Sequence, residues 1–346
     1  MDPASLLTDL TAGRTAALAR AISVVENARP GFEELLAGLH ARLGHARRIG
    51  ITGPPGAGKS TLTERLVGAW RAQGLRVAVV AVDPTSPFTG GALLGDRIRM
   101  ESIALDSGVF IRSMATRGSL GGLATTTREV CDVLDAAAFD RIVVETVGVG
   151  QSELDVGRSA DSTVLVLVPE SGDGIQTLKS GIMEIADVFV VNKADRPGAE
   201  KLRQEIEVTL GIRQGNAFRN VRAHHGLRGR PGRAAVPEAG AAAPSWVQPV
   251  VLTVAAKGEG IDELLRALDA HHAALEASGE LVARRKRRFL ERTREVVDRA
   301  ARRWVWSETG AQRHIDERID DIVAGRVSPY EVAAEVLDEL KQGERV

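Results

Sequence analysis

The sequence predicts an α/β fold in which a mostly parallel central sheet is flanked by helices. One observation is a series of short apolar runs that alternate with helical periodicity between residues 46 and 275. Strands of a parallel sheet are covered on both faces, so they read as continuous apolar runs. The other observation is a glycine-rich segment, residues 53–61, that joins the first apolar run to a helical pattern. Together they indicate buried parallel strands with helices packed on either side.

The elements of this fold can be assigned in chain order. A helical extension occupies residues 1–45, and its periodicity over 5–45 falls into two pieces that are broken at Arg29, Pro30 and Gly31. A helix is expected over 60–74, directly after the glycine-rich segment. The expected strands lie within residues 47–53, 76–83, 109–114, 141–146, 162–169 and 187–195, and 249–268 supplies a last strand, a loop and a helix.

Two segments depart from the alternation. Residues 212–249 are rich in Ala, Gly, Arg and Pro and show little periodicity, so we expect an irregular surface insertion in the domain 46–275. Residues 276–346 are helical and highly charged. We therefore expect a separate C-terminal arm.

An apolar seam runs along this arm. Leu290, Val297 and Trp304 recur at seven-residue intervals, with Phe289 and Val296 beside them. A narrow seam on a charged helix suits packing against another helix. The seam could dock on its own domain or join two copies of the chain. We favour a homodimer.

Composition excludes several classes of protein. The 45 basic and 46 acidic residues nearly cancel, which argues against nucleic acid or an acidic membrane as a partner. A single cysteine, Cys131, excludes an intramolecular disulfide and a cysteine-based zinc site, and we expect it to be a buried helical thiol. No apolar run reaches the length of a membrane span, and the N-terminal segment lacks the apolar core of a signal peptide. A cytoplasmic protein is expected.

The glycine-rich segment predicts a phosphate site. It matches G-x-x-x-x-G-K-[ST] between a strand and a helix, the context that a P-loop requires. Its glycines allow backbone N–H groups to surround a phosphate, and the helix N-terminus adds a favourable dipole. Lys59 can reach the β- and γ-phosphates, and the Ser60 hydroxyl can bind Mg²⁺. The expected nucleotide-binding residues here are Gly53, Pro54, Pro55, Gly56, Ala57, Gly58, Lys59, Ser60 and Thr61.

A second motif predicts guanine as the base. Asn192, Lys193 and Asp195 belong to the sequence NKAD, which ends another apolar run. A carboxylate at Asp195 can accept hydrogen bonds from guanine N1–H and the exocyclic amine, which adenine does not offer as a pair. The loop after the next strand, Val254, Ala255 and Ala256, can present a backbone N–H to the guanine oxygen. GTP is therefore the expected substrate and GDP the product.

Three acids and one glycine complete the expected site. Glu145 ends a strand beside the phosphate loop, where a carboxylate can hold Mg²⁺ directly or through water. Gly148 can present its N–H to the γ-phosphate. Asp83 and Asp96 enclose a Pro- and Gly-rich segment that we interpret as a switch, with Ser60, Asp83, Asp96 and Glu145 as the metal set.

The motifs together resemble the MeaB/ArgK family of P-loop GTPases. The resemblance rests on GPPGAGKST, VDPTSPFTGGALLGDRIRM, SMATRGSLGGLA, VETVGVGQSE, GIMEIAD and NKAD in this order, and it covers about residues 5–340. It implies the fold class of signal-recognition-particle and MinD-type NTPases, a homodimer formed by the C-terminal extension, and a mobile loop at 169–187 that signals to a partner. Departures from the family pattern occur at Glu170, Ser171, Gly174 and Val254.

The resemblance also implies a function. Such proteins assist an adenosylcobalamin-dependent acyl-CoA mutase, usually methylmalonyl-CoA mutase, by controlling cofactor loading from an adenosyltransferase and by protecting the mutase. Lys59, Asp83 and Asp96 are the expected catalytic residues, and slow intrinsic hydrolysis is expected because no arginine finger is evident among Arg97, Arg99 and Arg117. Two alternatives stay open: a transport-associated kinase, and a nickel-insertion GTPase, which would need a Cys/His cluster.

Overall fold

The computed structural model describes residues 2–84, 100–116, 122–146, 156–157, 159–169, 182–213 and 246–342. Within them lies a seven-stranded sheet in the order β3-β2-β4-β1-β5-β6-β7, and every neighbouring pair is parallel. The predicted α/β fold is confirmed. The strands are β1 (Arg47–Thr52), β2 (Val77–Pro84), β3 (Val109–Thr116), β4 (Arg141–Thr146), β5 (Ser162–Leu167), β6 (Val188–Asn192) and β7 (Val250–Thr253).

Helices connect and flank these strands. Short 3-10 turns lie at η1 (His40–Arg42) and η2 (Ala255–Lys257), and a π-helical turn lies at η3 (Trp304–Glu308). The α-helices are α1 (Pro3–Thr11), α2 (Thr15–Glu26), α3 (Phe32–Leu39), α4 (Lys59–Ala72), α6 (Glu101–Ala104), α7 (Gly122–Ala136), α10 (Ile182–Ile185), α11 (Ala199–Arg213), α12 (Ile261–Ser278), α13 (Glu280–Arg303), α14 (Ala311–Val323) and α15 (Pro329–Gln342).

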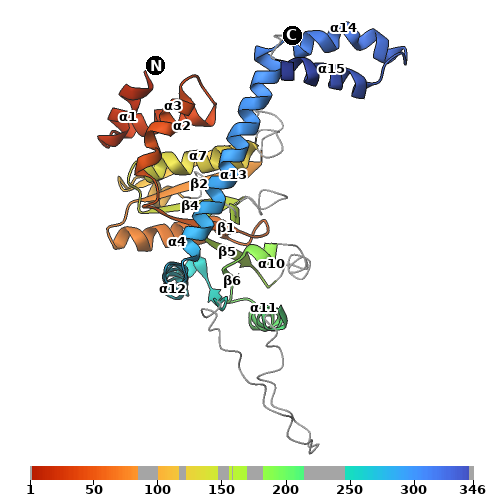
Figure 1. Ribbon diagram of the computed structural model, residues 1–346. Coiled ribbons are helices and arrows are strands. Elements are labelled where there is room, and N and C mark those ends of the chain that lie inside the picture. The colour runs from red at the N-terminus through yellow and green to blue at the C-terminus, as the bar shows by residue number, and fades with distance from the viewer. Residues whose placement is uncertain are drawn as a thin grey trace, which may run out of the picture. The chain divides into compact units, whose positions relative to one another are not determined.

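Alternate residues of each strand enter different cores, because successive side chains of a strand point to opposite faces. On one face, Val80 of β2 and Val144 of β4 pack with α7 and the N-terminal helices, and Phe189 of β6 packs with α10 and α11. On the other face, Val79 and Val143 pack with α4 and α12. Figure 1 shows α7 and α12 on opposite sides of the sheet.

The N-terminal extension differs from the expectation in its number of helices. It holds three, because the predicted first piece is interrupted between α1 and α2 at Gly13, whose φ of 77° is unfavourable for residues with a side chain. The predicted break near Pro30 is confirmed by the gap between α2 and α3. All three helices contribute buried residues to the core that contains α7, among them Leu10, Ile22 and Leu35.

The chain divides into two compact units, residues 1–285 and 286–346. The first contains the sheet, the N-terminal helices and the beginning of α13. The second contains the rest of α13, α14 and α15. None of the described helices combines the length and the low charge that crossing a membrane would require.

The edges of the predicted insertion are regular or anchored. Helix α11 continues to Arg213, and residues 214–245 lie outside the described part of the chain. Trp246 donates from Nε1 to the Asp187 carbonyl at 2.8 Å, and Gln248 donates to the Ala186 carbonyl at 3.0 Å. Residues 246–249 have no regular secondary structure, and these two hydrogen bonds attach them to the segment before β6.

Candidate nucleotide site

The predicted nucleotide motifs meet at one edge of the sheet. The glycine loop follows β1, Glu145 is the penultimate residue of β4, and Asn192 is the last residue of β6. Ile51 of β1 pairs with Glu145, and Asn192 pairs with Thr253 of β7. These are the carboxyl ends of parallel strands, where open α/β sheets bind ligands.

The glycines of the loop are required by its conformation. Gly53, Gly56 and Gly58 have φ values of 137°, 74° and 87°, which residues with side chains rarely adopt. A Cβ on Gly53 would lie 2.1 Å from the Val166 carbonyl oxygen, and one on Gly58 would lie 2.4 Å from Asn192 Nδ2. The loop is therefore held against β5 and β6 at a distance that only glycine permits.

Lys59 begins α4 and folds back over the loop. Its ammonium donates to the Gly53 carbonyl at 2.7 Å and to the Pro54 carbonyl at 3.0 Å, and only 6% of the residue is exposed. Buried lysines require such partners because an uncompensated charge is costly to desolvate. The positive charge is thus fixed at the mouth of the loop, where a phosphate would accept from it.

Glu145 connects β4 to α4. The Ser60 hydroxyl donates to Oε1 at 2.5 Å and the Thr63 hydroxyl donates to Oε2 at 2.8 Å, while 3% of Glu145 is exposed. Ser60 and Thr63 are three positions apart, so their side chains lie on one face of the helix. A buried carboxylate beside the first turn of α4 is an oxygen donor set of the kind that Mg²⁺ accepts.

Asn192 joins the phosphate corner to the guanine corner. Its Nδ2 donates to the Ala57 carbonyl at 2.8 Å, and its Oδ1 accepts from the Thr253 hydroxyl and the Ala255 amide, both at 3.1 Å. The asparagine is 3% exposed. One side chain therefore fixes the spacing between the P-loop and the loop after β7.

Arg65 supports the same loop from α4. Its Nε donates to the Ala255 carbonyl at 3.1 Å, and an Nη donates to the Ala256 carbonyl at 2.8 Å. The carbonyls thereby face α4, while Asn192 accepts from the Ala255 amide of this short 3-10 turn. Sequence reasoning missed Arg65, since nothing local in α4 indicates a partner about 190 residues away.

Asp195 lies at the rim of the predicted guanine site. Its carboxylate is 3.3 Å from Lys257 Nζ, and the two side chains are 43% and 58% exposed. Lys193, between Asn192 and Asp195, has a φ of 58°, which marks a tight turn after β6. Lys257 was also missed, although its place directly after Ala255 and Ala256 is a usable signal. The predicted contact residue Val254 is 8% exposed and begins this turn.

Other predicted residues are placed only in part. Asp83 is the penultimate residue of β2, one position beyond Val82, which pairs with Thr146 of β4. Asp96, Gly148 and residues 170–181 lie outside the described residues. Across the described ranges, no group of three His, Cys, Asp or Glu side chains is arranged to hold a metal ion. Cys131 is buried in α7, as expected.

Comparisons with known proteins agree with this geometry. The family model for the methylmalonyl-CoA mutase-associated GTPase MeaB matches residues 18–309. A Pyrococcus abyssi relative that carries a GTPase name is 43% identical over 339 residues, 98% of this chain and 97% of its own. The mouse mitochondrial methylmalonic aciduria type A homolog is 35% identical over 298 residues, 81% of this chain and 66% of its own.

A solved structure shares the fold. The crystal structure of LAO/AO transport system kinase has a TM-score of 0.66 and 27% identity, and the match covers 98% of this chain and 97% of that one. The shared fold and the GTPase names of these relatives agree with the P-loop and the guanine motif of this chain. The chain belongs to the MeaB family of methylmalonyl-CoA mutase-associated GTPases.

Proposed function

We propose that this protein is a Mg²⁺-dependent GTPase that acts as a chaperone of an adenosylcobalamin-dependent acyl-CoA mutase, with methylmalonyl-CoA mutase as the first client to test. The observation that carries the mutase part is the family match over residues 18–309. The name of the mouse relative, a methylmalonic aciduria type A homolog, supports it. In this proposal the protein works in the cytoplasm and also meets the adenosyltransferase that supplies the cofactor.

The side chains around the P-loop account for the hydrolytic chemistry. Attack of water on the γ-phosphate needs positioning and charge neutralisation more than a strong base. Lys59 would exchange the Gly53 and Pro54 carbonyls for phosphate oxygens and take up part of the developing charge. Ser60 and Glu145 have the oxygen donors that fit Mg²⁺, which when bound supplies charge neutralisation at the β- and γ-phosphates.

Asp83 and Asp96 complete the proposal as a switch. The end of β2 lies beside β4, so Asp83 belongs to the same edge as Glu145. We assign both aspartates to orientation of metal-bound or attacking water, and Gly148 to contact with the γ-phosphate. Asp96→Ala is expected to impair Mg²⁺-dependent hydrolysis more than GDP affinity, measured by phosphate release and nucleotide titration. Equal loss of both would contradict the switch assignment.

The C-terminal unit supports a homodimer. Leu290, Val297 and Trp304 of the predicted seam are 53%, 58% and 46% exposed. Phe289 beside them is 42% exposed. Apolar side chains of this size repeated along a charged helix suit burial against a second helix. Light scattering of the full chain would give the mass of a dimer if the seam pairs, and that of a monomer if it does not.

A kinase is the rival activity, because the solved relative is titled a transport system kinase. Hydrolysis and phosphoryl transfer are separated by the fate of the γ-phosphate. With γ-labelled GTP, a hydrolase releases labelled inorganic phosphate at a rate that does not depend on a protein acceptor. Label that accumulates on a substrate-binding protein instead would favour the kinase.

The client is tested by capture in defined nucleotide states. Purified protein is immobilised with GDP or with a non-hydrolysable GTP analogue and offered cobalamin mutases that differ in acyl-CoA substrate. We expect one mutase to be retained to an extent that depends on the nucleotide. Lys59→Ala should lose that dependence, whereas Arg203→Gln on α11, whose exposed pair with Glu200 is far from the P-loop in sequence, should keep it. Failure to retain any mutase in either state would refute the chaperone while leaving the GTPase intact.

A further inference from the structure

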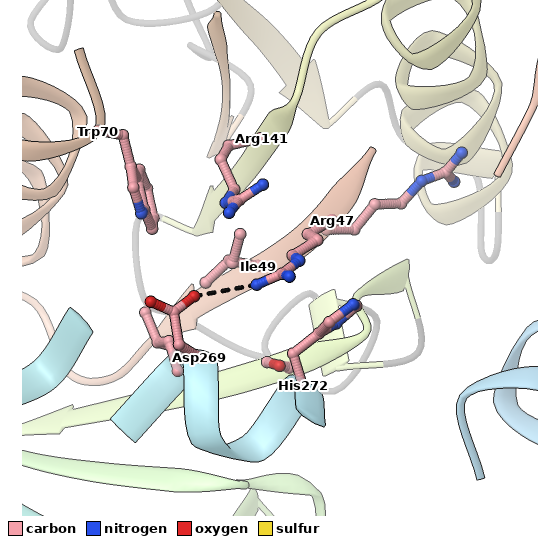
Figure 2. A pocket seen from close by; sticks show the side chains of 9 residues that line it. Arg47, Ile49, Trp70, Arg141, Asp269 and His272 are labelled. Carbon is pink, nitrogen blue, oxygen red and sulfur yellow. Dashed lines mark hydrogen bonds and ion pairs between the residues drawn. The ribbon is translucent and has the colours of Figure 1, made fainter. Parts of the chain in front are cut away.

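A second pocket lies at the opposite edge of the sheet from the nucleotide loops. It is bounded by the first residues of three strands, Arg47 of β1, Arg141 of β4 and Ser162 of β5, together with Trp70 of α4 and His272 of α12. Figure 2 shows the Arg141 guanidinium and the Arg47–Asp269 pair facing the same space. All of these residues belong to the first compact unit. None of them takes part in the proposed GTP chemistry.

Two arginines stand side by side in this pocket. Arg47 and Arg141 are register partners on the adjacent strands β1 and β4, so their side chains leave the same face of the sheet. Neighbouring strands are about 4.8 Å apart, and like charges directly opposite each other are destabilising. Unfavourable pairs of this kind persist where an anion offsets them.

The carboxylates near the pocket do not neutralise the positive charges of both Arg47 and Arg141. Arg47 forms an ion pair of 2.9 Å with Asp269, which is 61% exposed. The side chain of Arg141 makes a single hydrogen bond within the described residues, from Nη1 to the carbonyl of its neighbour Asp140 at 3.1 Å. Most of the five N–H donors of its guanidinium are therefore available.

A third arginine in the wall is already neutralised. Arg48 reaches Asp132 at 2.7 Å and Asp135 at 3.3 Å, and its side chain is 10% exposed. Arg48 thus has two carboxylate partners, whereas the Arg141 side chain is bonded to a carbonyl, so Arg141 is the cation of this pocket whose charge is not neutralised. Burial, followed by the charge of Arg47, lowers the pKa of Arg141, while Asp269 and Asp140 oppose this shift only in part. Arginine nevertheless stays protonated, so the imbalance is met by binding an anion rather than by losing a proton.

The remaining walls favour a ligand over bulk water. Trp70 is 2% exposed and closes one side, next to the apolar side chains of Ile49 and Leu268. His272 is 5% exposed, and burial, followed by the charge of Arg47, lowers the pKa of its imidazole. The ring is therefore neutral at pH 7 and adds no competing charge. Charge-assisted hydrogen bonds are stronger in such partly desolvated surroundings.

We propose that Arg141 and Arg47 form a binding site for a small oxyanion, a phosphate or carboxylate group, at the amino edge of the sheet. The planar guanidinium groups match the geometry of both anions. Asp269 is the internal competitor, because its carboxylate already accepts a hydrogen bond from Nη1 of Arg47. Since Asp269 is exposed, an incoming anion can displace it toward solvent and bridge the two arginines.

The test is a titration of full-length protein with inorganic phosphate and, separately, with malonate. The P-loop is first filled with Mg²⁺ and a non-hydrolysable GTP analogue, so that anions cannot bind there, and ionic strength is held constant. Calorimetry should detect one site. Arg141→Gln should weaken binding by about 10- to 100-fold, the range expected for a charge-assisted hydrogen bond. Asp269→Asn should strengthen it several-fold, and Arg203→Gln on α11 should leave it unchanged.

The test is specific because Arg141→Gln and Asp269→Asn should change the anion affinity in opposite directions. General destabilisation would weaken binding in both, and unaltered thermal unfolding of Arg141→Lys would show that the fold tolerates change at this position. The proposal is overturned if Arg141→Gln binds like wild type, or if Asp269→Asn weakens binding. Tighter binding of phosphate than malonate would assign a phosphate ligand, and the reverse a carboxylate. If GTP binding itself failed, the difference in anion binding between nucleotide-free Lys59→Ala and the same variant with Arg141→Gln added would still report on this pocket.

Discussion

The two edges of one sheet use polar groups in different ways. At the carboxyl edge, the glycines let the P-loop approach β5 and β6 closely, and Asn192 joins that loop to the loop after β7. At the amino edge, where the parallel strands begin, aspartates accept hydrogen bonds from backbone amides. Asp161 accepts from the Arg48 amide at 3.0 Å and Asp187 accepts from the Thr163 amide at 2.9 Å, so each acid satisfies a donor at the start of a strand.

Arginines then neutralise the acids of the amino edge. Arg284 donates to both carboxylate oxygens of Asp187, at 2.9 and 3.0 Å, and Arg285 reaches Asp161 at 3.2 Å. The difference between the edges teaches that polar residues of similar burial belong to the proposed nucleotide site on one side and hold the fold together on the other. Arg141 is the exception at this edge, because its side chain donates to a carbonyl and not to a carboxylate.

Lys59→Ala should have the largest effect on function. It removes the cation held over the P-loop, and loss of one preorganised donor to a transition state lowers kcat by about 10²–10³-fold. Phosphate release under saturating GTP measures this. Asp187→Asn is the matched variant at the other edge and should retain turnover per folded molecule. If Lys59→Ala kept its turnover, the proposed role of the P-loop in hydrolysis would be wrong.

Asp187→Asn should have the largest effect on stability. Burial alone raises the pKa of Asp187, but contacts with His271 and Arg284 outweigh it, so the net pKa lies below its ordinary value. We expect a loss of about 3 kcal/mol in the free energy of unfolding at pH 7, since the substitution removes the buried carboxylate to which Arg284 donates twice. Urea unfolding measures it.

The effect of Asp187→Asn has a defined pH dependence. A carboxylate with a lowered pKa in the folded state contributes fully above the ordinary pKa of aspartate, about 3.9, and loses its contribution as pH falls through the lower folded value. The difference between wild type and variant should therefore shrink below about pH 4. Asp269→Asn, in an exposed pair, should change stability by no more than about 0.5 kcal/mol at any pH. A pH-independent deficit in Asp187→Asn would contradict the charge argument.

Arg65→Gln tests whether the guanine loop depends on support from α4. Releasing the Ala255 and Ala256 carbonyls should raise the KM for GTP by about 10-fold with kcat nearly unchanged, because Arg65 orients the loop and does not touch phosphate. Steady-state kinetics with GTP and with ITP, which lacks the exocyclic amine, measure the split. If kcat fell together with the rise in KM, Arg65 would have to act on the hydrolytic step and not only on the guanine loop.

Lys257→Ala should have the smallest effect. Its pair with Asp195 is exposed on both sides, so we expect at most about a threefold loss of GTP affinity at low salt. Screening should erase the difference near 0.5 M salt. Fluorescent nucleotide titration at two salt concentrations checks this. A large, salt-independent loss would indicate that Lys257 contacts the nucleotide.

Most of the fold could be predicted from local sequence patterns. The P-loop, Glu145 and Asn192 were found because their residue types recur at the ends of apolar runs, and parallel strands bring those ends to one edge. The break at Gly13 was missed because a single glycine within a helical pattern has no local mark that distinguishes a cap from a tolerated residue.

Long-range partners could not be predicted in this way. Arg65 meets a loop 190 positions later, and Arg47 becomes the neighbour of Arg141 only through the register of β1 and β4. Both contacts depend on strand order, which the sequence does not encode locally. For the same reason the role of α13 in the amino edge was not foreseen.

The contacts of Arg284 and Arg285 determine where the GTPase part of this chain can be cut. A fragment that ends at residue 275 would lack both arginines and leave Asp161 and Asp187, whose side chains are 1% and 8% exposed, as buried acids without these cations. Such a fragment should be recovered as aggregate even though every nucleotide motif is present. The shortest fragment expected to fold therefore includes the first two turns of α13, and a recombinant GTPase fragment should end after Arg285.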